Sequence, residues 1–248
     1  MKSSDLIIGR QPLLEAIQAG RPIDKILFQR NVSGESIGEI RKLAQKMNIP
    51  IQQVPPEKLH GLTRANHQGV IAYAALFTYL DLQSVIDHTV SEGQTPLFVL
   101  LDGITDVRNI GAIARSAVCF GAQAIIIPDK GIAALNEEAL KSSAGALEKI
   151  SICRVTSLLK AVDSLHLNGI RAFASTMESE RKASDLPLEQ PSCIMMGSED
   201  RGLQPYLNKA ADEQFTIPMS GRFDSLNVSV AAGIILYEAL KKRTGLKG

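Results

Sequence analysis

Three loops in the second half of the chain carry residue types that do chemistry in proteins. They are DGITDVRNIGAIAR at residues 102–115, GSEDRGL at 197–203 and IPMSGRFDSLNVS at 217–229. They offer carboxylates that accept protons, amides and hydroxyls that form hydrogen bonds, and guanidinium groups that bind phosphates. Each loop follows a short apolar run, so we expect it at the carboxyl end of a strand, where ligands of parallel sheets bind.

The first loop leads into a helix, predicted over residues 110–120, that carries one arginine on an unusual face. The helical period gives an apolar stripe made of Ile110, Ile113, Ala114, Ala117 and Val118. Arg115 lies off this stripe, beside the small residues Gly111, Ala112, Ser116 and Cys119. We expect Asn109 to cap the helix and Gly111 to admit a close partner. The sequence is equally consistent with a salt bridge formed by Arg115 and with a contact between Arg115 and a ligand.

The second loop follows a predicted buried strand and contains two adjacent carboxylates. Gly197 and Gly202 permit tight turns or the close approach of a ligand. We interpret Glu199 as functional, because a carboxylate at the end of a strand orients a substrate or accepts a proton. We interpret Asp200 and Arg201 as solvated residues of a surface turn.

The third loop begins a helix that is apolar on nearly every side over residues 228–236. This pattern predicts a deeply buried helix, and the basic residues 241–243 lie at its end, where the helix dipole favours cations. Ser225, Asn227 and Ser229 stand at its first turn. Capping requires only one such residue, so at least one of the three has another role.

Length and composition indicate a globular protein with one large domain or two ordinary ones, since the 248 residues are 45% hydrophobic and 21% charged. The formal net charge of +1 neither supports nor excludes an RNA partner. Cys119, Cys153 and Cys193 lie far apart in apolar runs, which is typical of reduced core residues. Because there is no signal-peptide core and no membrane span, we expect a cytoplasmic protein.

Alternating helical and strand patterns divide the chain into two α/β domains. A small domain spans residues 1–76, a linker with one short helix spans 77–95, and a larger domain spans 96–248. In the larger domain, short apolar runs without two-residue alternation lie between helical segments. This arrangement predicts a mainly parallel sheet that is covered on both faces.

Familiar nucleotide and metal motifs are missing from the sequence. There is no G-x-G-x-x-G, G-x-x-x-x-G-K-[ST], H-E-x-x-H or G-x-S-x-G, and no Cys/His metal spacing, so we expect no metal site. None of the four histidines lies in the three loops. We interpret His67, in NHQGV, as a structural or RNA-facing residue of the first domain.

In this order and at these separations, the three loops resemble the motifs of the SpoU (TrmH) family of RNA ribose 2′-O-methyltransferases. The matching residues are Asn109, Gly111, Arg115, Gly197, Ser198, Glu199, Gly202, Ile217, Pro218, Ser225, Leu226, Asn227, Ser229 and Ala232. The chain departs from the family pattern in GSEDRG, where GSEGxG is usual, and at Arg222, Phe223 and Asp224, where smaller residues are common. Through IIGRQPLLEAI and NHQGVIA, the first domain resembles the substrate-binding domain of the RlmB-like branch and ribosomal proteins that bind RNA bends.

The resemblance implies a SPOUT-type α/β fold whose C-terminal part is threaded as a trefoil knot, preceded by a small α/β RNA-binding domain, in a homodimer. It implies S-adenosylmethionine as the cofactor, held by backbone groups near Gly197, Ile217 and Leu226. It also implies a catalytic cluster formed by Asn109, Arg115, Glu199, Ser225 and Asn227.

The leading hypothesis is methyl transfer to the ribose 2′-hydroxyl of a guanosine in large-subunit (23S) ribosomal RNA, because tRNA-modifying relatives commonly lack the first domain. The alternatives are a tRNA 2′-O-methyltransferase, an enzyme for another ribosomal nucleotide, and a non-catalytic RNA-binding or ribosome-assembly protein. A guanidinium stays protonated, with a pKa above roughly 12. We therefore expect Arg115 to clamp a phosphate beside the target ribose. Candidates for a local RNA surface are Arg10, Arg21 and Arg64.

Overall fold

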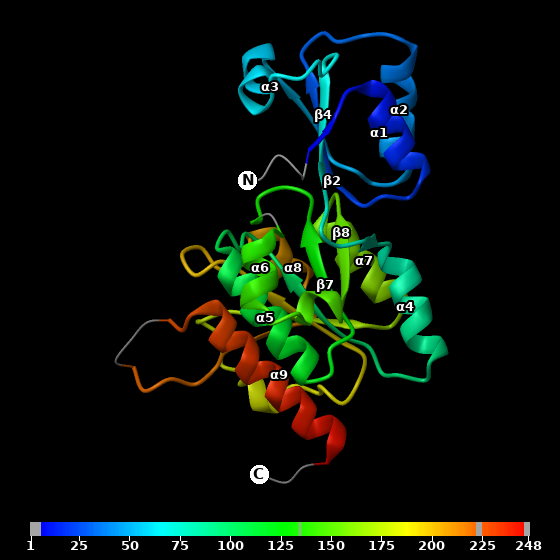
Figure 1. Cartoon of the computed structure of the whole chain (residues 1–248). Helices are drawn as coiled ribbons and strands as arrows, with labels where there is room; N and C mark the ends of the chain where they lie inside the picture. The colour runs from blue at the N-terminus through cyan, green and yellow to red at the C-terminus, as the bar shows by residue number, and fades with distance from the viewer. Residues whose placement is uncertain (1–5, 134, 222–224, 246–248) are drawn as a thin grey trace. The chain divides into compact units, whose positions relative to one another are not determined.

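The computed structural model of the chain describes residues 6–133, 135–221 and 225–245. Contacts divide the chain into two units, Met1–Thr78 and Tyr79–Gly248 (Figure 1). The division falls inside the segment 77–95 that was expected to link two domains.

The first unit contains a four-stranded sheet in the order β1-β4-β2-β3. Its strands are β1 (Leu6–Ile8), β2 (Ile23–Gln29), β3 (Ile51–Val54) and β4 (Val70–Ala74). Its helices are α1 (Arg10–Gln18), α2 (Glu35–Lys46) and α3 (Pro56–Leu62). Strands β2 and β3 are parallel, whereas β4 is antiparallel to β1 and β2. The α/β character predicted for this part of the chain is present.

The side chains of β2 point alternately to the two faces of this sheet, so the strand contributes to a hydrophobic core on each face. Ile26 and Phe28 pack with the buried residues of α1 and α2. Leu27 packs on the other face with Leu59 of α3. This second core fixes α3 to the sheet and so positions residues 60–69, which are the end of α3 and the loop after it.

The second unit contains a seven-stranded sheet in the order β11-β9-β10-β6-β7-β8-β5, and every neighbouring pair is parallel. Its strands are β5 (Tyr79–Leu80), β6 (Leu97–Leu101), β7 (Ala124–Pro128), β8 (Ser151–Val155), β9 (Arg171–Ser175), β10 (Ser192–Met196) and β11 (Glu213–Phe215). Its helices are α4 (Leu82–Ser91), α5 (Val107–Cys119), α6 (Glu137–Ser142), α7 (Leu158–Leu167), α8 (Pro205–Ala210) and α9 (Val228–Thr244). The predicted parallel α/β fold is confirmed.

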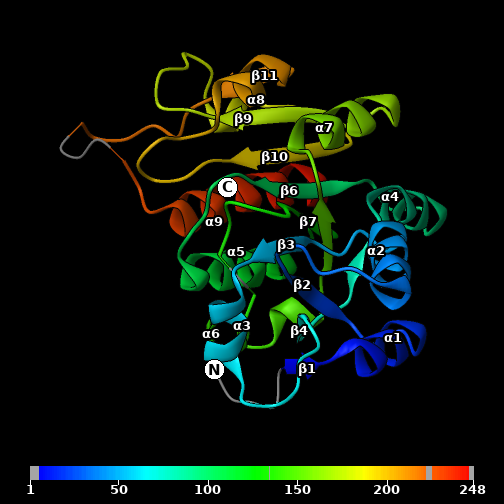
Figure 2. The ribbon, with the colours of Figure 1, turned by 90° about the horizontal axis from the view of Figure 1, so that it is seen from above.

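Helices cover both faces of this sheet. One face of β6, with Phe98 and Leu100, packs in a core that also holds residues of α4, α7 and α8. Helix α5 contacts both α6 and α9, and these three helices form the other layer, as Figures 1 and 2 show. No helix among the described residues has the length and apolar character needed to cross a lipid bilayer.

Most of the segment 77–95, from Tyr79 onward, belongs to the second unit rather than forming a free linker. Strand β5 pairs with β8 at the edge of the sheet. Helix α4, the short helix predicted in this segment, buries Leu82, Val85 and Ile86 in the core. The spacing of these residues gives α4 an apolar face, and covering that face holds the segment against the sheet.

The three cysteines are free thiols. Cys153 and Cys193 are buried, and burial, followed by the nearby Asp81, raises the pKa of Cys153 to about 12. Burial also raises the pKa of Cys193. The prediction of a core position is wrong for Cys119, which is exposed at the end of α5 because the helix turns it away from the apolar stripe.

Candidate active site

Strand register brings the candidate loops to one edge of the second unit. The last residues of β6 and β10, Leu101 and Met196, are direct partners, so the first two loops start side by side. Strand β9 pairs with β10, and Phe215 at the end of β11 pairs with Ser175 at the end of β9. The carboxyl ends of four strands therefore lie at one edge of the sheet, which is where ligands of parallel sheets bind.

Helix α5 begins at Val107 rather than at Ile110. Its N-cap is Asp106, whose carboxylate accepts a hydrogen bond from the Arg108 backbone N–H, so the prediction that Asn109 caps the helix is wrong. Hydrogen bonds from Arg108 lower the pKa of the Asp106 carboxyl. Asn109 lies inside the first turn, and its side chain reaches the other two loops.

The three loops meet at the carboxylate of Glu199. Its Oε1 accepts hydrogen bonds from Asn227 Nδ2 at 2.6 Å, Asn109 Nδ2 at 3.2 Å and the Val228 N–H at 3.2 Å. Asn227 Nδ2 also donates to Asn109 Oδ1 at 3.1 Å. Oε1 accepts from all three of these donors and no described residue donates to Oε2, so Oε2 is the oxygen of Glu199 that remains for a substrate.

Asn227 connects this network to the start of α9. It is the N-cap of the helix, and its Oδ1 accepts hydrogen bonds from the Ser229 N–H at 3.0 Å and the Ser229 hydroxyl at 2.5 Å. The amide oxygen therefore caps the helix while the amide nitrogen holds Glu199. Ser225 takes no part in this cap and is exposed. Arg222, Phe223 and Asp224 lie outside the described residues.

Close packing of backbone shapes the loop after β10. A Cβ on Gly197 would lie 2.0 Å from the carbonyl carbon of Gly202, so only glycine fits there. Gly202 has a φ of 63° and donates its N–H to the Ser198 carbonyl at 2.8 Å. The close partner of Gly197 is thus its own chain. Asp102, buried at the end of β6, accepts the Gln204 N–H at 2.9 Å and ties this loop to the first one.

A cavity of about 370 Å³ opens beside the network, and this volume is ordinary for a site that holds a small organic ligand. The three residues expected to hold a cofactor, Gly197, Ile217 and Leu226, all line it, and so do Glu199 and Ser225. Within the described residues, no three His, Cys, Asp or Glu side chains gather as metal ligands.

The loop after β9 also lines this cavity and was missed from the sequence. Ser175, Thr176, Met177 and Glu178 contribute to the wall. They form no recognisable sequence motif, and only the order of the strands in the sheet indicates that they belong to the site. Because β9 lies between β10 and β11, its following loop reaches the same edge of the sheet.

Arg115 is not part of the hydrogen-bond network. It is exposed on α5, and it forms no hydrogen bond or ion pair with any residue that the structure describes. The salt-bridge interpretation is therefore not supported. A Cβ on Gly111 would lie 1.9 Å from Ser142 Oγ, so the close partner predicted for Gly111 is α6 of the same chain.

Helix α9 is not buried on every side, which corrects the prediction from its apolar sequence. Val228, Ala232, Ile235, Leu236 and Ala239 face the interior. On the opposite side Val230, Ile234 and Tyr237 are 50%, 37% and 47% exposed. Tyr237 contacts Phe120, just after α5, ring to ring with centroids 5.8 Å apart. The exposed apolar side of α9 is therefore continuous with the end of α5.

Two family models match the chain, one for each unit. The SpoU rRNA Methylase family matches residues 96–237. The model described as RNA 2′-O ribose methyltransferase substrate binding matches residues 6–80. A relative from Staphylococcus saprophyticus, named as a TrmH family tRNA/rRNA methyltransferase, is 35% identical over 238 residues, which are 96% of this chain and 96% of that protein.

Solved structures of this family share the fold. The SpoU methyltransferase AviRb of Streptomyces viridochromogenes, solved in complex with AdoMet, has a TM-score of 0.61 and 27% identity, covering 97% of this chain and 90% of that one. A structure described as an RNA 2′-O ribose methyltransferase has a TM-score of 0.57 and 26% identity, covering 96% and 88%. With a family match over more than half of its length and motif residues assembled at one sheet edge, the chain belongs to the SpoU rRNA methylase family and is an RNA methyltransferase.

Proposed function

We propose that this protein methylates the ribose 2′-hydroxyl of a guanosine in 23S ribosomal RNA, using S-adenosylmethionine. The observation that carries the proposal is the network of Asn109, Glu199 and Asn227 beside the cavity that Gly197 and Leu226 line. The AdoMet complex of AviRb and the substrate-binding match of the first unit support the cofactor and the RNA class.

The cavity suits a ligand that is partly apolar and partly cationic. Ile217 and Leu226 offer apolar surface to a nucleoside, whereas Glu178 and Glu199 offer negative charge to a sulfonium. When bound, S-adenosylmethionine supplies an electrophilic methyl group. Gly197 holds the turn of Ser198–Gly202 in place, so the backbone around that ligand is rigid before binding.

The chain's own residues align the ribose and form no covalent bond with it. The ribose oxygen forms a bond to the methyl carbon while the carbon–sulfur bond breaks, and the hydroxyl proton leaves to a neighbouring phosphate oxygen. In this proposal Glu199 Oε2 and Ser225 orient the ribose, and Asn109 and Asn227 hold Glu199. Their role is alignment, which contributes strongly to displacement reactions.

Arg115 has the role of a phosphate clamp in this proposal. Its guanidinium is exposed and has no partner among the described residues. A planar guanidinium binds two phosphate oxygens at once, and this geometry would hold the strand next to the reacting ribose.

The proposed assembly is a homodimer that covers the exposed side of α9. Val230, Ile234 and Tyr237 present large apolar side chains there, and Cys119 of α5 lies on the same layer. A second copy of the chain offers the same apolar surface. A dimer with a two-fold axis at this surface would therefore bury the apolar side chains of both copies. Arg115, exposed on α5, would then lie near the boundary between two subunits.

The substrate is tested by methyl transfer in vitro with labelled S-adenosylmethionine, using 23S ribosomal RNA and tRNA from cells that lack the gene. We expect one 2′-O-methylguanosine, mapped by mass spectrometry, in the 23S RNA. Methylation of tRNA alone, or of another ribosomal nucleotide, would replace the guanosine assignment. Absence of S-adenosylmethionine binding in calorimetry would instead favour a non-catalytic RNA-binding protein.

The clamp is tested by Arg115→Lys, with Arg108→Lys on the same helix as the charge-matched control. Lysine keeps the charge but loses the two-pronged geometry, so we expect methyl transfer to fall at least about tenfold in Arg115→Lys, because each lost charged hydrogen bond weakens binding by roughly 1.5–3 kcal/mol. Arg108 is already paired with Asp106 at 2.8 Å, and its variant should keep near-normal rates. Near-normal rates for Arg115→Lys would refute the clamp.

A further inference from the structure

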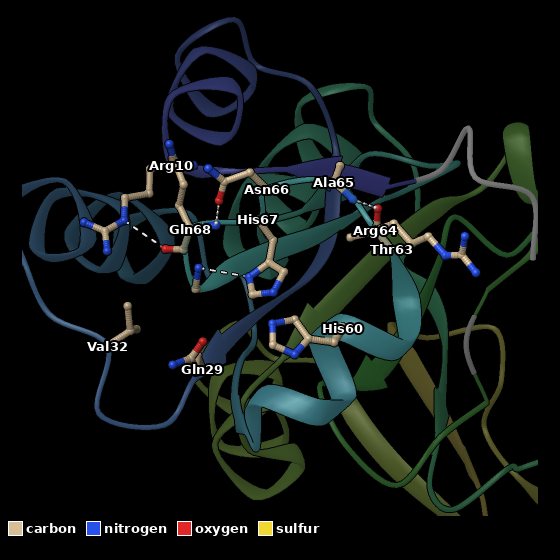
Figure 3. Close-up of a pocket in the computed structure, with 11 residues that line it drawn as sticks. Arg10, Gln29, Val32, His60, Thr63, Arg64, Ala65, Asn66, His67 and Gln68 are labelled. Atoms are coloured by element: carbon tan, nitrogen blue, oxygen red, sulfur yellow. Dashed lines mark hydrogen bonds between the residues drawn. The ribbon is translucent and has the colours of Figure 1, made fainter.

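The first unit contains a pocket of its own, about 700 Å³ in volume, that the reaction described above does not use. It lies between the start of α1 and the segment of residues 60–69, and Figure 3 shows the side chains that line it. Among the described residues that line it, two are arginines and two are histidines, and none is acidic. A pocket of this composition attracts an anion that also carries a flat ring.

The base of the pocket is rigid. His67 is only 7% exposed, and its Nδ1 accepts the Gly69 N–H at 3.0 Å. Gln68 and Gly69 have φ values of 51° and 81°, a left-handed conformation that this hydrogen bond helps to hold. Asn66 Oδ1 accepts the Gln68 N–H at 3.3 Å and closes the turn from the other side.

Arg10 is held in place without a carboxylate partner among the residues that the structure describes. Its Nε donates to the Gln68 carbonyl at 3.0 Å, and its backbone N–H donates to Gln68 Oε1 at 3.2 Å. The two terminal nitrogens of the guanidinium therefore remain for a ligand. Arg64 is exposed and has no ion pair with a described residue. Figure 3 shows Arg10 and Arg64 on opposite sides of the pocket, with the two imidazoles between them.

The imidazoles form a surface on which a base can stack. The rings of His60 and His67 have centroids 4.9 Å apart and are tilted by 45°. His60 is exposed and His67 is buried behind it, so one ring is accessible and the other supports it. Because Nδ1 of His67 accepts a hydrogen bond, the neutral ring carries its hydrogen on Nε2.

We infer that this pocket binds one unpaired nucleotide of the RNA substrate, with the base on the His60 ring and the flanking phosphates at Arg10 and Arg64. This inference rests on the proposed function for its source of RNA. Stacking on aromatic rings, with arginines along the backbone, is how proteins bind single-stranded RNA. A duplex keeps its bases paired and presents no base to the pocket. Gln29 and Asn66 add amide groups that can read the edge of a base.

The test uses the full chain and a short fluorescein-labelled single-stranded RNA, with fluorescence anisotropy as the measure of affinity. We expect His60→Ala to weaken binding about tenfold, because stacking contributes roughly 1–3 kcal/mol per base. His88→Ala, which removes an exposed histidine of α4, is its control. Arg64→Ala should weaken binding comparably. Lys58→Ala, an exposed lysine of α3 outside the pocket lining, should change it much less.

A second strand carries 2-aminopurine, whose fluorescence is quenched when the base stacks. We expect quenching by the wild-type protein and its loss in His60→Ala, an effect that a purely structural role would not produce. The RNA duplex of the same sequence should bind more weakly than the single strand. Guanosine monophosphate should compete only at far higher concentration than the strand.

Several outcomes would overturn the inference. Unchanged affinity and quenching in both pocket variants would exclude the base site. Equal binding of duplex and single strand would point to a duplex surface, and tight binding of free guanosine monophosphate would assign the pocket to a mononucleotide. Methyl transfer by the wild-type protein is measured separately. Its absence would refute the proposed function, while the quenching result would still decide the pocket.

Discussion

Glu199 is the residue that joins the three loops. The hydrogen bonds around it explain why the residue types at positions 109 and 227 are restricted. Asn109 and Asn227 each offer an amide with a donor and an acceptor, and both ends of Asn227 are used. An aspartate would keep the acceptor and lose the donor. A lysine or glutamine at either position would not fit the short distances to Glu199 Oε1.

The variant Asn227→Asp separates these two functions of the side chain. Its carboxylate still caps α9 through the Ser229 N–H, but it places a second negative charge where Asn227 Nδ2 lies 2.6 Å from Glu199. We expect methyl transfer to fall at least about a hundredfold, since like charges so close oppose each other strongly. Partial recovery at lower pH should follow, because one proton shared by the pair restores a donor. Unchanged rates with normal thermal stability would contradict this role.

His67 makes the stability of the first unit depend on pH. Burial, followed by the nearby His60, lowers the pKa of His67 below its ordinary value of 6.5. Above that pH both folded and unfolded chains hold a neutral ring. As the pH falls between the unfolded and folded pKa values, the unfolded chain binds the proton first, and stability is lost.

The matched variant is His67→Asn, whose amide oxygen can accept the Gly69 N–H in place of Nδ1 but does not titrate. Thermal melts at about pH 7.5 and pH 5 should show a larger drop in melting temperature for the wild type than for the variant. Equal drops would mean that His67 does not carry this pH dependence.

At the scale of elements, the packing of α5 against its neighbours determines where the site residues lie. Gly111 contacts α6, and Ser116 lies opposite Gly233 of α9. These contacts set the position of Asn109, which precedes Gly111 by two residues on the same helix. The apolar stripe of α5 was predictable from its period, but the identity of the helices that cover α5 was not.

Two glycine substitutions test this packing. Gly111→Ala puts a methyl group 2.7 Å from the Ala139 carbonyl oxygen, and we expect a loss of about 1–3 kcal/mol in the free energy of unfolding. Gly233→Ala meets only Ser116 Oγ at 3.6 Å, an ordinary contact. Because alanine favours a helix over glycine by about 1 kcal/mol, this control should be neutral or stabilising. Chemical denaturation measures both, and equal effects would contradict the packing argument.

At the scale of the whole molecule, the exposed side of α9 is the feature that a single chain leaves unexplained. The sequence is apolar on nearly every side of the helix, yet the chain itself covers only one of them. The proposed dimer would cover the other. The trefoil knot stays a prediction of the family resemblance, since the order of paired strands does not establish threading.

The dimer is tested by Val230→Glu, with Leu167→Glu as the control. Val230 is 50% exposed and Leu167 is 89% exposed, so the folded chain tolerates a charge at either site. We expect Val230→Glu to be monomeric in light scattering and Leu167→Glu to remain dimeric, because only the first buries a charge at the interface. A monomeric wild-type protein, or a dimeric Val230→Glu variant, would contradict the proposed interface.

The sequence by itself determined the parallel α/β fold, the three motif loops and the family, because apolar strands, their spacing and loop chemistry are local properties of the chain. The start of α5, the place of β5 and α4, and the exposure of Cys119 required the tertiary structure. So did the loop after β9, which has no motif of its own, and the pocket lined by His60 and His67, which the fold assembles from segments that are far apart in the sequence. The reason is physical: strand order and helix packing decide which distant residues become neighbours, and local spacing carries no information about that order.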